Sequence, residues 1–171
     1  MSKAFIRESD DESGAEEIPS FRSQLPPGIS NYITREGADG LKQRLNDLLE
    51  KKAALVSTRT AGAAAEVDQR KIESAIRKLQ QTLDSVIVAE VPADQEKVAF
   101  GATVTVRHGN GEEAAYHIAG MEEAEPERGS ISWISPLARA MLSRRVGDQI
   151  TFRSPAGDEV LTILSVRYLE G

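Results

Sequence analysis

The spacing of apolar residues between Thr34 and Val88 constrains this chain more than any other feature of its sequence. In the second half of the stretch they recur at alternating steps of four and three residues, at Ile72, Ile76, Leu79, Leu83 and Val86. The first half keeps the same steps at Leu41, Leu45, Leu48 and Leu55, with Lys52 in the one remaining place. Such steps are typical of the a/d seam of a coiled coil. The pattern therefore predicts two helices that pack along one seam.

A run of small residues at 60–65 separates the two halves of this pattern and contains a single glycine, Gly62. Glycine inside a helix costs about 1 kcal/mol relative to alanine, so an uninterrupted helix gains nothing from it. We therefore predict that the chain reverses near 60–65 and that 32–90 forms an antiparallel coiled-coil hairpin. Arms of about 25 residues would be roughly 35 Å long. Thr34 is a suitable N-cap for the first arm.

The two flanks of the hairpin differ in composition. Residues 1–31 combine a cluster of acidic side chains with several prolines, and they hold little apolar surface that could offset the entropy of ordering. We predict an unfolded acidic leader there. The polar stretch 93–96 marks the boundary with a C-terminal domain over 96–171.

Beyond that boundary the apolar pattern changes to period two, which is typical of β-strands. The glycine-containing turn at 108–111 predicts that 113–119 pairs back on 103–107 as a hairpin. Ser135 and Pro136 are residue types preferred at the N-cap and the first position of a helix. We predict further strands over 130–134, 149–153 and 159–168, the last two paired as a hairpin around the turn at 155–158. The fold class is therefore α+β: a helical hairpin followed by a small antiparallel β-sheet domain with one helix.

Composition excludes several classes of function. The 171 residues carry a formal net charge of −6, which disfavours tight binding to free duplex DNA because neutralised phosphates dominate such affinity. Without cysteine there is neither a disulfide framework nor a thiolate metal site. His108 and His117 are nine residues apart and fit no metal-ligand spacing. We predict a cytoplasmic, monomeric protein with no membrane segment, no cofactor or metal of its own and no catalytic residues.

Four short motifs occur along the chain in a fixed order. They are residues 33–37 (ITREG), 98–104 (VAFGATV), 131–140 (ISWISPLARA) and 146–148 (VGD) followed by 154–157 (SPAG). In residue types and spacing they resemble the Gre family of bacterial transcription elongation factors, GreA and GreB. The resemblance covers roughly residues 32–170.

The resemblance implies a coiled-coil hairpin mounted on a C-terminal domain similar to FK506-binding proteins. It also implies a partner, RNA polymerase, whose secondary channel such factors enter with the domain on the rim and the hairpin pointing to the active centre. In the family, two acidic residues at the hairpin tip help to hold a catalytic Mg²⁺ and position water, so that the polymerase cleaves a backtracked transcript. Such a factor is no enzyme by itself, and it meets nucleic acid only within the elongation complex.

The sequence departs from the family at the hairpin tip. The stretch 60–65 (TAGAAA) holds no carboxylate where the family carries Asp and Glu. The hairpin is also about a dozen residues shorter, which withdraws the tip by roughly 9 Å. The nearest acids, Glu66 and Asp68, are two positions apart and would point to different sides of a helix. A polymerase-held Mg²⁺ would gain a ligand only if one of them came within about 2 Å, so we expect little stimulation of cleavage.

Two further sets of residues are candidates for contacts within a polymerase complex. The basic set near the distal end of the hairpin is Lys51, Lys52, Arg59, Arg70 and Lys71. It suits contact with RNA in the channel, although a solvated helix face is the simpler explanation. The docking set, which the resemblance implies, is Ile134, Ser135, Pro136 and Arg139. Ile134 stands where the family usually has Asp or Asn, and helix capping alone would explain Ser135 and Pro136.

Our leading hypothesis is a Gre-like modulator that occupies the secondary channel without strong stimulation of cleavage. An ordinary cleavage factor, with Glu66 or Asp68 moved into place, is the alternative within the family. A peptidyl-prolyl isomerase is an alternative of another class, which the few aromatic residues of 98–171 disfavour. A last alternative makes the hairpin a dimerisation arm with its seam through Leu79 and Leu83.

Overall fold

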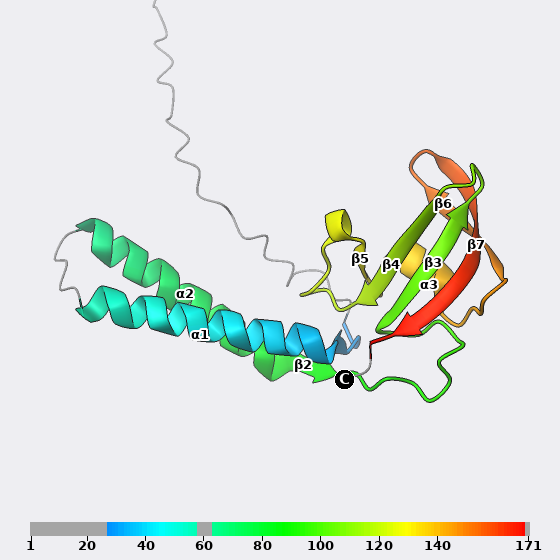
Figure 1. The fold of residues 1–171 in the computed structure, drawn as a ribbon. Coiled ribbons are helices and arrows are strands. Elements are labelled where there is room, and N and C mark those ends of the chain that lie inside the picture. Colours follow the sequence, from blue (N-terminus) through cyan, green and yellow to red (C-terminus); the bar gives the residue numbers. More distant parts are fainter. Residues whose placement is uncertain (1–26, 58–62, 170–171) are drawn as a thin grey trace, which may run out of the picture.

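The computed structural model describes residues 27–57 and 63–169. Figure 1 shows a rod of two antiparallel helices, α1 (Arg35–Ser57) and α2 (Ala63–Ser85), with a β-sheet head at its base. The predicted α+β class and the helical hairpin are confirmed. Most of the predicted acidic leader lies outside the described residues, as do residues 60–62 of the reversal predicted at 60–65; residues 63–65 belong to α2.

The hairpin packs along the face that the apolar spacing predicted. Each helix has 23 residues, so each arm is about 35 Å long. Leu41 and Ile76 of the seam are buried, and the other apolar seam residues are partly buried. Leu49 and Val56 lie off the seam and are 43% and 59% exposed. The two helices therefore bury one stripe each and leave the remainder of their surface to solvent.

A short parallel sheet, which the sequence pattern did not predict, closes the base of the hairpin. β1 (Asn31–Ile33) precedes α1 and pairs with β2 (Val86–Val88), which follows α2. Ala89 N also donates to Ile33 O at 2.9 Å. Ile33 is fully buried and joins Ala38 and Leu41 in a small apolar cluster. These contacts fix the register of the two arms at the base of the rod.

The head is built on a five-stranded sheet in the order β5-β4-β3-β7-β6. The strands are β3 (Ala102–His108), β4 (Glu113–Ala119), β5 (Ser130–Ser132), β6 (Gln149–Ser154) and β7 (Gly157–Tyr168). The predicted pairings of β3 with β4 and of β6 with β7 are confirmed. β5 pairs with β4 in parallel, after a connection through the 3-10 turn η2 (Pro126–Arg128). The sheet is therefore mixed, where the strand pattern predicted an antiparallel one.

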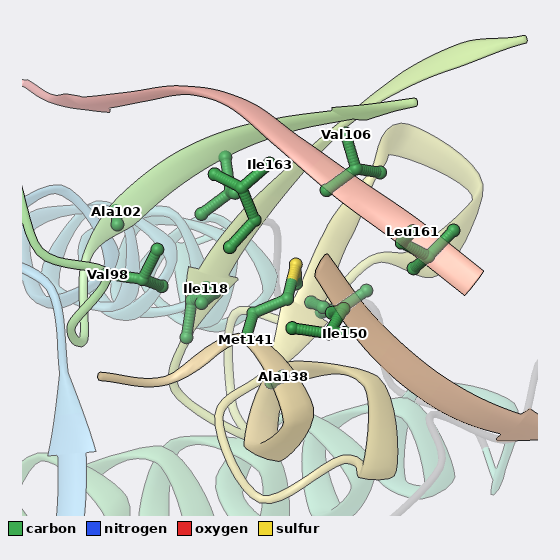
Figure 2. Packing of buried hydrophobic residues seen from close by; sticks show 11 residues of the cluster. Val98, Ala102, Val106, Ile118, Ala138, Met141, Ile150, Leu161 and Ile163 are labelled. Carbon is green, nitrogen blue, oxygen red and sulfur yellow. The ribbon is translucent and has the colours of Figure 1, made fainter. Parts of the chain in front are cut away.

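One face of this sheet carries the core of the head. Buried side chains alternate along β3, at Ala102, Val104 and Val106, because successive residues of a strand face opposite sides. Figure 2 shows Met141, from the helix α3 (Pro136–Met141), lying between Ile118 of β4 and Ile150 of β6. All three side chains are at most 3% exposed. α3 is thus held against the sheet by its own buried face.

Candidate functional site

The two acids nearest the hairpin tip, Glu66 and Asp68, both lie near the start of α2 and are exposed. A helix turns about 100° per residue, so positions two apart point roughly 200° from each other. Oε2 of Glu66 lies 3.9 Å from Nη2 of Arg70, one turn further along the same helix. The structure therefore directs the two carboxylates to opposite sides of α2 and gives Glu66 a partner of its own.

No metal-binding cluster occurs in the part of the chain that the structure describes: nowhere in 27–57 and 63–169 do three His, Asp or Glu side chains gather closely enough to hold an ion. The side chains of the two histidines instead contact neighbouring protein side chains. Nδ1 of His108 lies 2.5 Å from Oε1 of Glu159, and Nδ1 of His117 lies 3.2 Å from Oγ1 of Thr103. Both contacts join neighbouring strands of the head.

Lys52, the one charged residue of the predicted seam, is engaged across the hairpin. Its Nζ lies 3.0 Å from Oε1 of Glu73 on α2, and Nε2 of Gln69 donates to the same oxygen at 3.2 Å. The hydrogen bond from Lys52, followed by that from Gln69, holds the pKa of Glu73 below its ordinary value. The three side chains form a polar layer within an otherwise apolar seam.

The other basic residues of the candidate RNA-contacting set are placed differently from Lys52. Lys51, Arg70 and Lys71 are exposed, and Arg70 has Glu66 as its neighbour. Arg59 lies outside the described residues. An RNA contact by this set stays a prediction.

The candidate docking set lies on and just before α3, in the head. Ser135 is the N-cap of this helix, as predicted, and its Oγ accepts a hydrogen bond from Ala138 N at 3.2 Å. Pro136 occupies the first helical position, and Pro136 and Arg139 are exposed. Because residues three apart are neighbours on a helix surface, these two share one outward face. Ile134 is partly buried, so only part of its side chain contributes to this surface.

The joint between hairpin and head contains residues that the sequence did not single out. Both oxygens of Glu123, in the loop after β4, accept from Thr34: Oε2 from the backbone N–H at 2.8 Å and Oε1 from the hydroxyl at 2.5 Å. Oγ1 of Thr34 in turn accepts from Gly37 N at 3.0 Å, which confirms Thr34 as the N-cap of α1. The contact joins residues 89 positions apart in the sequence, so no local sequence pattern predicts it.

Three aromatic rings extend the joint on the side of β1. Tyr32 lies with its ring centroid 6.0 Å from that of Phe100 and 5.8 Å from that of Trp133, and the two head residues are 6.5 Å apart. Such tilted and edge-on arrangements are favourable geometries for aromatic pairs. Tyr32 therefore anchors the start of the hairpin in the head.

Side-chain contacts hold the segment that connects the hairpin to the head along its length. Arg145 binds two acids of this segment, with Nη2 at 2.5 Å from Oδ2 of Asp94 and Nη1 at 3.2 Å from Oε2 of Glu96. The Tyr168 hydroxyl accepts from Ala99 N at 2.9 Å and donates to Lys97 O at 2.5 Å. Burial raises the pKa of Tyr168 above its ordinary value. The covalent link between the two parts is thus held in place as well.

A cleft of about 630 Å³ opens where the hairpin meets the head. Arg35 and Glu36 of α1 line it on one side and His117 and Tyr168 of the head on the other. Its lining mixes charged, aromatic and apolar groups, without a set of buried polar atoms converging on one point.

Comparison with known proteins extends over about four fifths of the chain. A family profile described as "Transcription elongation factor, GreA/GreB, C-term" matches residues 93–168. Transcription elongation factor GreB of Neisseria meningitidis serogroup A is 34% identical over 155 residues, which cover 82% of this chain and 95% of that protein. Transcription elongation factor GreA of Geobacillus kaustophilus is 34% identical over 150 residues, covering 79% and 95%.

Among solved structures, the crystal structure of GreA factor homolog 1 (Gfh1) of Thermus thermophilus is similar to this chain with a TM-score of 0.39 and 22% identity, covering 81% of this chain and 99% of that one. Neither α1, α2 nor α3 has the length and apolar character of a membrane-spanning helix.

The sequence identity to GreB and GreA spans both the hairpin and the head. On that ground, the chain belongs to the GreA/GreB family of transcription elongation factors.

Proposed function

We propose that this protein binds bacterial RNA polymerase at its secondary channel, in the cytoplasm, and regulates elongation mainly by occupying the channel. The head would rest on the channel rim and the hairpin would point toward the active centre. Stimulation of transcript cleavage would be weak. Membership of the GreA/GreB family supports the partner and the site of binding, and this chain's own residues support the weak cleavage.

The placement of the acids carries this proposal. Mg²⁺ takes oxygen ligands at about 2.0–2.1 Å in near-octahedral geometry, so two carboxylates serve one ion only if they converge. Glu66 and Asp68 diverge around α2, and Glu66 lies beside Arg70. The residues ahead of them, 58–65, include no Asp or Glu at all. The distal end of the hairpin therefore offers little with which to hold a second catalytic metal.

The head supports docking through α3. Pro136 and Arg139 are exposed on one face of a helix whose other face is buried in the core at Ala138 and Met141. A short helix held rigidly in this way presents its outward side chains in a fixed arrangement. We propose that Pro136, Arg139 and the partly buried Ile134 form the surface that meets the channel rim.

A prolyl isomerase activity is disfavoured by the use of the aromatic residues. Phe100 and Trp133, which an apolar peptide pocket would need, pack against Tyr32 at the base of the hairpin. They are part of the joint between rod and head. The protein would therefore be no enzyme, and any cleavage would belong to the polymerase.

The test uses core RNA polymerase and stalled, backtracked elongation complexes. We expect the full chain to bind core polymerase, to compete with GreB of the same host for binding, and to release little cleaved transcript where GreB releases it rapidly. Arg139→Ala should weaken binding, and Arg70→Ala, a matched loss of an exposed arginine on the hairpin, should weaken it less.

Two outcomes would contradict the proposal in different ways. Absence of binding to core polymerase would remove the whole of it. Rapid cleavage that is lost in Glu66→Ala or Asp68→Ala would establish the ordinary cleavage role of the family and remove the part that rests on the diverging acids.

A further inference from the structure

The first turn of α1 is completed by a side chain from the head. In the usual capping box, the N-cap Ser or Thr bonds the backbone N–H of the third helical residue, and a Glu at that third position bonds back to the N-cap N–H. Thr34 makes the first of these contacts, to Gly37 N. The third position is a glycine, and the carboxylate that accepts the Thr34 N–H is Glu123, which comes from the loop after β4.

Two glycines make room for this carboxylate. A Cβ on Gly37 would lie 2.6 Å from Cδ and 2.9 Å from Oε1 of Glu123, distances that real Cβ atoms do not show. A Cβ on Gly120 would lie 3.2 Å from Oε2 of Glu123 and would press against the backbone of Tyr32 and Ile33. Neither glycine has a positive φ. Their place in the sequence is explained by the close approach of hairpin and head.

The electrostatics of the site favour the same arrangement. The N-terminus of a helix carries a partial positive charge, because its first N–H groups are unpaired and the peptide dipoles align. Glu123 brings its negative charge to the N-terminus of a helix of 23 residues. Ser130 Oγ donates to Glu123 O at 3.2 Å and helps to hold the loop that carries it. Both partners are anchored, Thr34 next to the buried Ile33 and Glu123 in a tethered loop.

We propose that Glu123 is a positioning residue: its bidentate contact with Thr34 fixes the direction in which the hairpin leaves the head. The proposal rests on the proposed function, since direction matters only if head and tip must reach the polymerase together. A change of about 10° at the base of a rod roughly 35 Å long moves its tip by about 6 Å. Such a displacement exceeds the tolerance of a specific contact, where about 1 Å already matters.

The first experiment measures direction without any partner. The chain has no cysteine, so spin labels can be placed on Ser74→Cys, exposed on α2, and Thr151→Cys, exposed on β6. Pulsed electron paramagnetic resonance then gives the distribution of distances between the two labels, and so between hairpin and head, in the full chain. We expect one narrow distribution, unchanged in Glu122→Ala, which removes the same charge from the neighbouring residue. Glu123→Ala should widen it at least about twofold, because the base loses both hydrogen bonds.

Variants separate positioning from folding. Glu123→Gln keeps the shape and one acceptor oxygen, so it should restore most of the narrow distribution. Far-ultraviolet circular dichroism should be the same for all variants, since the helices and the sheet keep their own contacts. A wild-type distance distribution in Glu123→Ala would overturn the proposal, as would a widening that is matched by Glu122→Ala.

The second experiment measures the consequence for transcription. Glu123→Ala should bind core polymerase with a Kd within about threefold of wild type, because α3 is untouched, while its effect on elongation at saturation falls about tenfold. Equal elongation effects of wild type and Glu123→Ala, despite a widened distance distribution, would refute the functional part of the inference. If the wild-type chain does not bind polymerase, the proposed function fails, and the distance measurement still decides whether Glu123 sets the direction of the hairpin.

Discussion

Replacing Gly37 by alanine should destabilise this protein, although the same change three residues later should stabilise it. Both glycines lie in α1, where alanine is favoured over glycine by up to about 1 kcal/mol. Around Gly40 a Cβ would meet nothing within 4 Å. At Gly37 the new Cβ would occupy the space of the Glu123 carboxylate. The side chain of Glu123 must then swing away, since the helix backbone cannot move without breaking its own hydrogen bonds.

The magnitude follows from the contacts that Glu123 would lose. Hydrogen bonds to a charged group contribute about 1.5–3 kcal/mol each when shielded. Glu123 is only partly buried, so the two bonds to Thr34 together are worth about 2–4 kcal/mol. Subtracting the alanine gain leaves Gly37→Ala destabilised by about 1–3 kcal/mol. Gly40→Ala should be more stable than wild type by up to about 1 kcal/mol.

Urea unfolding at neutral pH, followed by circular dichroism, gives both free energies of unfolding, and a double-mutant cycle supplies the control. In the Glu123→Ala background no carboxylate remains to be displaced, so Gly37→Ala should there be as favourable as Gly40→Ala. The difference between the two backgrounds is the coupling energy of Gly37 and Glu123. A stabilising Gly37→Ala in the wild-type background would refute the reasoning, because the carboxylate would then not occupy the N-terminus of α1.

Two further predictions concern the polar layer of the hairpin and the cap of α3. The pKa of Glu73 is lowered in the folded state, so its ion pair with Lys52 contributes stability that is complete above the ordinary pKa of 4.5 and is lost as the pH falls below that value. Glu73→Gln should remove this pH dependence of stability, which thermal unfolding measured over a series of acid pH values would reveal. The same pH dependence in wild type and Glu73→Gln would contradict the prediction. Ser135→Ala should lower the free energy of unfolding by about 1 kcal/mol, because α3 loses its N-cap. Two control variants should cost little: Ser135→Asn, which keeps a capping oxygen, and Ser74→Ala, at an exposed helical serine. Equal losses in Ser135→Ala and Ser135→Asn would show that the hydrogen bond to Ala138 is not the source of the stability.

Local periodicity predicted the parts of the fold in which neighbours in sequence are neighbours in space. The four-and-three spacing found the buried stripe of both helices, including Leu41 and Ile76. The turn at 108–111 predicted the pairing of β3 with β4, and Ser135-Pro136 predicted the start of α3. In each case the signal and the structure that it specifies lie within one or two turns of chain.

The contacts that escaped prediction join distant segments. β1 has three residues, too few to show any period, and its pairing with β2 spans both helices of the hairpin. β5 is equally short, so its parallel direction followed from nothing local. In the sequence Glu123 is one of four glutamates within 122–127, and nothing local distinguishes it. The one available signal was Gly37, which occupies the helix position where a capping box would place Glu.

Lys52 shows how a single position can carry two opposed interpretations. As a charge near the distal end of the hairpin it suited an RNA contact, and it also occupies the one seam position that is not apolar. The structure pairs it with Glu73, and a polar group at one a/d position is the kind of feature that selects a register at some loss of stability. Any RNA contact by Lys52 would first have to break this pair, so Lys51 and Lys71 are the better candidates for that role.

A factor that acts by occupying a channel, as we propose for this protein, requires its hairpin to point in one direction. The contacts of this hairpin are arranged accordingly. The sheet of β1 and β2 fixes the register at the base, the Lys52–Glu73 pair fixes it further out, and the contact of Thr34 with Glu123 fixes the direction of the whole rod. Each of these contacts constrains position and none contributes a free carboxylate at the distal end. If the protein instead stimulated cleavage strongly, acids of the hairpin would carry the effect. Loosening the joint through Glu123→Ala should then reduce cleavage, while the Kd for core polymerase again stays within about threefold of wild type because α3 is untouched.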